Sequence, residues 1–194
     1  MTAVRQPRLT VVEYLAYDLA HEGRHEFYNG EVVAMAGGSE AHALVTINLA
    51  AALRGALASS GCRVYSGDLR VRTEEHGAFV YPDLTVVCGP SVLLPTTPPT
   101  LTNPRLVAEV LSPSTAAHDR GAKAANYRRI VSLSAYVLVD IAERRVEALH
   151  RAEDGVWRLA EAQGDAELDL TPLGIRLKLA DIWAGLEDVV EDGG

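Results

Sequence analysis

The chain has 194 residues, of which 48% are apolar and 23% charged, and its formal net charge is −8. These values predict one folded domain spanning residues 1–194 and exclude a disordered chain. The acidic balance excludes a protein that binds nucleic acid over its whole surface, so a polyanion would need a local basic patch. The sequence has no apolar run typical of a secretion leader or a membrane span, so we expect a cytoplasmic location and no membrane partner.

The two cysteines, Cys62 and Cys88, stand in apolar surroundings and lack the spacing of metal ligands. Unpaired cysteines of this kind are typical of a reducing compartment. We therefore expect two separate buried thiols and no disulfide.

The first elements in chain order are a short helix and a hairpin. Thr10 stands three residues before Glu13, which is the spacing of a capping box, and the helix should end near Gly23. Two strand-like runs then flank the pair Asn29-Gly30. This pair favours a two-residue turn, because both turn positions need positive φ.

A longer helix follows, with Ser39 as its expected N-cap and Gly61 after its last turn. Its apolar residues recur at roughly helical spacing, namely Leu44, Ile47, Leu53 and Leu57. Residues 62–89 then predict three strands, which we expect to form a meander.

The second half of the chain alternates strands with a helix. Residues 90–104 contain five prolines and predict an exposed, irregular connection. Residues 105–111 and 135–140 predict buried strands, and residues 112–132 predict the helix between them. Residues 144–186 predict further antiparallel strands and a short final helix. The order indicates an α/β (α+β) fold, with a mixed β-sheet flanked by helices and additional antiparallel strands at both ends.

Two acids interrupt apolar strands: Asp83 in YPDLTVVCGP and Glu109 in RLVAEVL. A carboxylate buried without a partner is costly, so something must offset the burial. If the two strands pair, both carboxylates meet at one end of the sheet and offer the oxygen ligands that Mg²⁺ or Mn²⁺ prefers. In the alternative interpretation, Glu109 pairs with Arg105 or Lys123 and has only a structural role.

The helix after the second acidic strand carries three polar residues at successive i, i+4 positions: Asp119, Lys123 and Tyr127. They share one helix face. Ser114 or Thr115 is the expected cap. From this face, Lys123 would reach a phosphate oxygen or a water and stabilise charge that develops in a transition state. Packing explains Tyr127 more simply, and an ion pair with Lys123 would explain Asp119.

The segments YPD, VAEVLSPST, DRGAKAANYRR and AYVLVD together resemble the Uma-two family of restriction-endonuclease-like proteins, within the PD-(D/E)xK nuclease superfamily. The resemblance runs from the GEVV of the predicted hairpin to LKLADIW, and it implies a restriction-endonuclease-like core. It implies Asp83 as the first acid and Glu109 as the second. Leu111 stands where the superfamily motif has its lysine, and Lys123 resembles the substitute that this family takes from the next helix.

The resemblance also suggests accessory residues. His42 lies in the long early helix, where the family usually has a histidine. Related nucleases often place a further acid in this region, and Glu31 and Glu40 are candidates. A purely structural histidine and a solvated helix cap are the alternative interpretations of His42 and Glu40.

These observations predict a Mg²⁺-dependent endonuclease that hydrolyses phosphodiester bonds, with DNA as its nucleic-acid partner and a homodimer as its assembly. Asp83 and Glu109 would bind the metal, and these two residues with Lys123 would be catalytic. Phosphate contacts would come from Arg54, Arg70, Arg72, Arg128 and Arg129. Two other functions stay open: a catalytically silent nuclease fold that binds nucleic acid or a protein partner, and a structural or regulatory protein whose acids only form salt bridges. Metal binding would discriminate the nuclease from both.

Overall fold

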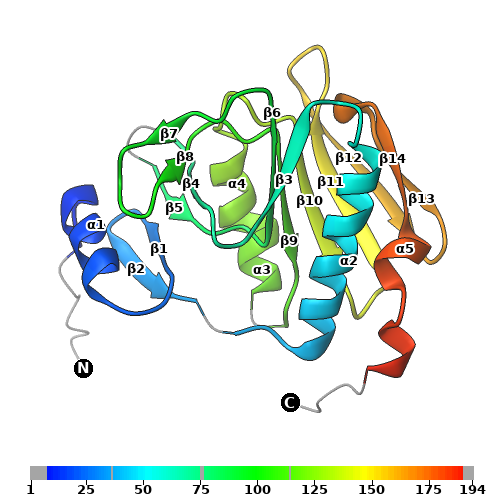
Figure 1. The fold of residues 1–194 in the computed structure, drawn as a ribbon, viewed down its shortest axis with the longest axis horizontal. Helices are drawn as coiled ribbons and strands as arrows, with labels where there is room; N and C mark the ends of the chain where they lie inside the picture. The colour runs from blue at the N-terminus through cyan, green and yellow to red at the C-terminus, as the bar shows by residue number, and fades with distance from the viewer. Residues whose placement is uncertain (1–7, 36, 75–76, 114, 190–194) are drawn as a thin grey trace.

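The centre of the structure is a six-stranded mixed sheet. The computed structural model describes residues 8–35, 37–74, 77–113 and 115–189. The strands follow the order β12-β11-β10-β9-β6-β3, in which β9 and β10 are parallel and the other neighbours are antiparallel (Figure 1). Their bounds are Cys62–Ser66 for β3, Leu84–Cys88 for β6, Leu106–Val110 for β9, Ala135–Asp140 for β10, Arg145–Arg151 for β11 and Trp157–Gln163 for β12.

Both faces of this central sheet are covered. One face packs against α2, α5 and the hairpin β13–β14, and the other against the helix that precedes β10. That helix consists of α3, a π-helical turn and α4. The bounds are Glu40–Ala56 for α2, Ala116–His118 for α3, Asp119–Lys123 for the π-helical turn, Ala124–Tyr127 for α4, Glu167–Leu170 for β13, Ile175–Lys178 for β14 and Leu179–Trp183 for α5. Within the described ranges, no helix combines the length and apolar character that crossing a membrane requires.

A second sheet lies beside the first and contains the N-terminal strands. Its order is β2-β1-β5-β4-β8-β7 (Figure 1). Helix α1 packs on it through Tyr14, whose ring lies 4.8 Å from Phe27 and 5.3 Å from Phe79. The bounds are Val11–Ala20 for α1, His25–Tyr28 for β1, Glu31–Ala34 for β2, Arg70–Arg72 for β4, Phe79–Val80 for β5, Leu93–Leu94 for β7 and Thr100–Leu101 for β8.

Several local predictions are confirmed. Thr10 and Glu13 form the capping box of α1, and Ser39 caps α2 by accepting a hydrogen bond from the His42 N–H. Asn29 and Gly30 form the two-residue turn between β1 and β2, with φ values of 48° and 92°. The predicted fold class, a mixed sheet flanked by helices with antiparallel strands added at both ends, is also confirmed.

The predicted meander is wrong, because residues 62–89 form four strands in two sheets. β3 pairs with β6 in the central sheet, whereas the intervening β4 and β5 pair with each other in the second sheet. The apolar face of α2 also differs from the prediction. Val45, Leu49 and Leu53 are buried at i, i+4 spacing, whereas Ile47 is exposed.

The proline-rich segment is more ordered than predicted. It contains β7 and β8, and β8 lies between β4 and β7 rather than at a sheet edge. Thr100 and Leu101 of β8 are fully buried, so this end of the segment belongs to the core. The prolines flank the two short strands and do not interrupt them, because a proline inside a strand would remove a ladder donor.

The expectation of two separate thiols is also wrong. Cys62 and Cys88 are directly opposite each other in the β3–β6 pair and form a disulfide. The sequence did not indicate this pairing, because the β4–β5 hairpin separates the two strands along the chain. The cysteines therefore give no support for a reducing compartment.

Removal of this cross-link should destabilise the fold. The disulfide closes a loop with a sequence separation of 26, so Cys62→Ser/Cys88→Ser should lower the free energy of unfolding by about 2–4 kcal/mol. Urea unfolding with and without a reductant measures this loss. The reductant should lower the urea midpoint of unfolding of the wild type alone, since the double variant has no bond to reduce. Two thiols that titrate in the native, unreduced protein would contradict the cross-link.

Candidate active site

Glu109 is a buried acid on the central strand β9. The side chains of β9 alternate between the two faces of the sheet, so that Ala108 and Val110 pack on the α2 side whereas Val107 and Leu111 pack toward α4. Glu109 lies on the same face of the sheet as Val107 and Leu111, and it is 5% exposed. The hydroxyl of Tyr127, on α4, donates a hydrogen bond of 2.8 Å to Glu109 Oε1. A polar group thus enters an otherwise apolar layer at this point.

Asp83 directly precedes β6, whose antiparallel pairing with β9 begins with Leu84 opposite Ala108. The charge of Asp83 is close enough to Glu109 to contribute to the raised pKa of that acid. The backbone N–H of Val110 donates a hydrogen bond of 2.7 Å to Asp83 Oδ2. This bond joins the first predicted acid to the residue that follows the second.

His42, in the first turn of α2, faces the same carboxylate. Its Nε2 lies 3.3 Å from Asp83 Oδ2. The hydrogen bond with Asp83 raises the pKa of His42, burial opposes this effect, and the charges of Asp83 and Glu109 add to it. The predicted accessory histidine is therefore part of the same group of side chains.

Lys123 lies among three acids. Its Nζ is 2.8 Å from Glu109 Oε1, 3.2 Å from Glu26 Oε1 and 3.7 Å from Asp119 Oδ1. An ammonium group has three N–H donors and no acceptor, so three carboxylates match its donors. As the helical spacing predicts, Lys123 reaches the acid of the preceding strand, and its partners include Asp119.

The π-helical turn shapes this face of the helix. It spans Asp119–Lys123 and so underwinds the helix between the first and second of the three predicted residues. The backbone carbonyl of Asp119 accepts a hydrogen bond from the Tyr136 hydroxyl, and Arg120 forms ion pairs with Asp140 and Glu147 on the sheet. The turn is therefore anchored to β10 and β11, and π-helical turns inside helices are frequent at functional sites.

Glu26, on β1, is a member of the site that the sequence analysis missed. It is 7% exposed, whereas Glu31, the predicted accessory acid in this region, is exposed at the start of β2. Among the described residues, the N-terminal acid that pairs with Lys123 is Glu26 and not Glu31. The sequence carried no signal for Glu26 itself, although its partner Lys123 is one of only two lysines in the sequence.

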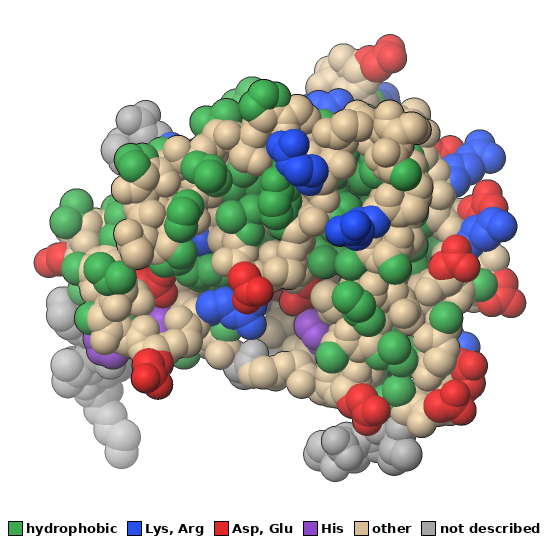
Figure 2. Space-filling view, viewed as in Figure 1, with side chains coloured by type: hydrophobic (Ala, Val, Ile, Leu, Met, Phe, Trp, Pro, Cys, Tyr) green, Lys and Arg blue, Asp and Glu red, His purple; other side chains and the backbone are tan. Residues whose placement is uncertain are grey.

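The site carries an excess of acids over bases. Glu26, Glu109 and Asp119 surround one lysine, so two negative charges remain if all four groups ionise. Burial raises the pKa of Glu109 to about 8; Lys123 opposes this increase, and Asp83 and Glu26 add to it. Burial disfavours the charged form of Lys123, but the three acids outweigh it and raise the pKa of Lys123. Figure 2 shows exposed acidic, basic and histidine side chains around a hollow in the lower half of the face that it presents, whereas Glu26, Glu109, Asp119 and Lys123 are themselves each less than a tenth exposed.

The predicted phosphate-binding arginines have different surroundings. Arg70 is fully buried and forms an ion pair of 2.6 Å with Asp18, so its assignment as a phosphate contact is wrong. Arg129 is exposed and pairs with Glu74. Arg54 and Arg128 are exposed, and Arg72 is half-buried. The physical reason for the error at Arg70 is a carboxylate that lies far away in sequence and supplies the charge a buried guanidinium needs.

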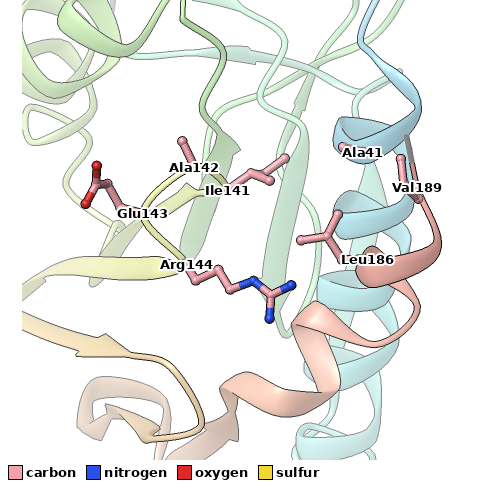
Figure 3. Close-up of a pocket in the computed structure, with 7 residues that line it drawn as sticks. All are labelled: Ala41, Ile141, Ala142, Glu143, Arg144, Leu186 and Val189. Atoms are coloured by element: carbon pink, nitrogen blue, oxygen red, sulfur yellow. The ribbon is translucent and has the colours of Figure 1, made fainter. Parts of the chain in front are cut away.

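A separate cavity lies between the start of α2 and the turn after β10 (Figure 3). The side chains around it are mostly apolar, apart from Glu143 and Arg144 on the turn. None of the clustered acids lines it, so the candidate active site is not this cavity. Its lining residues are Ala41, Ile141, Ala142, Glu143, Arg144, Leu186 and Val189.

The raised pKa of Glu109 predicts a pH-dependent stability. An acid whose pKa is higher in the folded state stabilises the fold fully below its ordinary pKa of 4.5, and this contribution is lost as the pH rises through about 8. Glu109→Gln mimics the protonated acid at every pH, so its stability relative to wild type should increase between about pH 5 and about pH 9. Thermal unfolding across this range measures the difference.

Glu167→Gln is a matched control, because Glu167 is an exposed acid on β13. The unfolding temperature of Glu167→Gln should change with pH in the same way as that of the wild type. Curves for Glu109→Gln and wild type that run parallel from acid to alkaline pH would contradict a raised pKa at Glu109.

Comparison with known proteins identifies the family. Residues 11–180 match Uma2, described as "Putative restriction endonuclease". Two uncharacterized proteins of Synechocystis sp. are similar in sequence. One, slr1290, is 32% identical over 180 residues, which cover 93% of this chain and 94% of the relative. The other, sll1609, is 33% identical over 164 residues, which cover 84% of this chain and 93% of the relative.

A solved structure shares the fold. The crystal structure of "a putative nuclease belonging to DUF820" from Anabaena variabilis superposes with a TM-score of 0.71 over 90% of this chain and 97% of the other. The sequences are 14% identical, so the likeness concerns the fold alone. Because the family match spans most of the sequence, this chain belongs to the Uma2 family, as its acidic motifs predicted.

Proposed function

We propose that the protein is a metal-dependent nuclease that hydrolyses phosphodiester bonds of DNA. The observation that carries the proposal is the approach of Lys123 Nζ to within 2.8 Å of Glu109, beside an Asp83 that the Val110 N–H holds. Two carboxylates and one ammonium at the end of paired strands are the groups that metal-assisted phosphoryl transfer needs. Family membership supports the same reaction class.

The donor set of the site fits Mg²⁺ or Mn²⁺. Within the described part of the chain, no three His, Cys, Asp or Glu side chains are grouped so as to hold a metal ion. Two carboxylates suffice for Mg²⁺, which keeps several waters and completes its shell with substrate phosphate oxygens. The closest contacts of Asp83 and Glu109 go to Oδ2 and Oε1 respectively, so each carboxylate has a second oxygen to offer. When bound, the metal would supply positive charge at the phosphate and lower the pKa of a water.

The chain's own side chains would have distinct roles. Lys123, kept charged by its acids, would stabilise negative charge on the phosphate and orient the attacking water. Tyr127 would hold Glu109 through its hydroxyl, and His42 would hold Asp83. Asp119 would keep the Lys123 ammonium in the site.

A silent nuclease fold is the second candidate function. Its support is Leu111, a buried apolar residue that stands where the superfamily motif has its lysine. Such a protein would bind nucleic acid or a protein partner without cleaving it. The predicted single domain, homodimer and cytoplasmic location stay predictions.

Asp83 and Lys123 should have separable effects on metal binding and cleavage. Asp83→Asn should abolish both Mn²⁺ binding and cleavage, because it removes a proposed metal ligand. Lys123→Ala should leave Mn²⁺ affinity nearly intact and slow cleavage by about 10²–10³-fold, the usual effect of removing one contact to a developing charge. Calorimetry with Mn²⁺ beside cleavage of plasmid DNA measures both quantities.

Lys178→Ala is the matched control, because Lys178 is the other lysine and is exposed on β14. It should match the wild type in both assays. A wild type that binds Mn²⁺ and cleaves no DNA or RNA would favour the silent fold, and a Lys123→Ala variant as fast as wild type would remove Lys123 from the mechanism.

We expect that arginine at position 123 does not restore the function of Lys123. Lys123→Arg keeps the charge, but a planar guanidinium cannot direct its donors at three converging carboxylates as an ammonium does. We expect cleavage within about 10-fold of Lys123→Ala, although Lys and Arg carry the same charge. Wild-type rates in Lys123→Arg would show that charge alone is sufficient at this position.

A further inference from the structure

Glu26 is bound at both of its carboxylate oxygens. Oε1 accepts a hydrogen bond of 2.9 Å from the backbone N–H of Tyr81 and lies 3.2 Å from Lys123 Nζ. Oε2 accepts a hydrogen bond of 2.7 Å from the Tyr28 hydroxyl. With 7% of its surface exposed, the side chain has little freedom to move. Such a set of partners fixes the carboxylate in one orientation.

The partners of Glu26 belong to two separate parts of the proposed active site. Tyr81 stands two residues before Asp83, in the segment that enters β6. Lys123 lies on the helix that packs against the face of the central sheet that carries Glu109. A single carboxylate oxygen of Glu26 therefore contacts both the segment that carries the first acid and the lysine.

We propose that Glu26 is a positioning residue that holds the Lys123 ammonium against Glu109 and fixes its place relative to Asp83. The inference rests on the proposed nuclease function and assigns a residue of the N-terminal sheet to the active site. Lys123 has a long, flexible side chain, and its remaining partners are Glu109 at 2.8 Å and Asp119 at 3.7 Å. Without the charge of Glu26, the ammonium would be attracted only by Glu109 and Asp119 and would shift away from the β1 side of the site.

The first experiment observes Lys123 directly and does not depend on activity. Because lysine occurs only at positions 123 and 178, protein labelled with ¹⁵Nζ-lysine gives two ammonium environments in an NMR spectrum. Glu26→Gln keeps the size of the side chain and removes its charge. It should shift the Lys123 ammonium signal and leave the signal of the exposed Lys178 unchanged.

Leu168→Ala is the matched control for a loss of stability. Leu168 is buried on β13, in the core on the α2 side of the central sheet, which is the face opposite to Glu109. It should lower the unfolding temperature without moving the Lys123 signal. An unchanged Lys123 signal in folded Glu26→Gln would overturn the proposal, whether or not the wild type cleaves DNA.

The second experiment measures Mn²⁺-dependent cleavage of plasmid DNA. Glu26→Gln should lower kcat about 10- to 100-fold, as expected when a catalytic group is misplaced, with KM and Mn²⁺ affinity close to wild type. In a Lys123→Ala background the same change should cause no further loss, because residues that act through one another are not additive. Equal losses in both backgrounds, or an effect confined to KM, would overturn the positioning role.

Tyr28→Phe provides a milder variant in case Glu26→Gln does not fold. It removes the hydrogen bond to Oε2 and keeps the Glu26 charge. The Lys123 signal should shift in the same direction by a smaller amount, with a smaller loss in kcat, and no shift would overturn the proposal. If the wild type cleaves no nucleic acid, the nuclease function fails, and the NMR result alone decides whether Glu26 positions Lys123.

Discussion

The burial of three carboxylates around one ammonium is the interaction on which the rest of the site depends. Glu26, Glu109 and Asp119 come from β1, β9 and the π-helical turn, and each is less than a tenth exposed. Without Lys123, these carboxylates could stay buried together only by taking up protons, because a poorly solvated interior disfavours neighbouring like charges. The ammonium therefore allows acids from the N-terminal sheet, the central sheet and the helix to stay ionised beside one another.

The parts of the site that the sequence revealed are those with a local pattern. Asp83 and Glu109 were conspicuous because each interrupts an apolar run, and Lys123 because helical spacing aligns it with Asp119 and Tyr127. Glu26 had no such contrast, since its strand also contains His25 and Tyr28. The burial of Glu26 results from the packing of one sheet beside the other, and the residue pattern of a four-residue strand does not predict such packing.

The errors share a physical cause, which is contact between residues far apart in the chain. The charge of Arg70 suggested an exposed side chain, but Asp18, on α1, pairs with it inside the fold. The Cys62–Cys88 bond depends on an intervening hairpin that leaves the central sheet for the other one. Composition and spacing describe each segment alone, so they predicted the elements well and their partners poorly.

The path of the chain between the two sheets has an evolutionary consequence. β5 ends at Val80 in the second sheet and β6 begins at Leu84 in the central sheet, so the crossing occurs at Tyr81, Pro82 and Asp83. The clustered side chains therefore lie where the two sheets meet, with Glu26 in one sheet and Glu109 in the other. A shorter relative that lacked the first two strands would lack the carboxylate that Glu26 places beside the lysine, so an insertion or deletion in the N-terminal segment would alter the cluster.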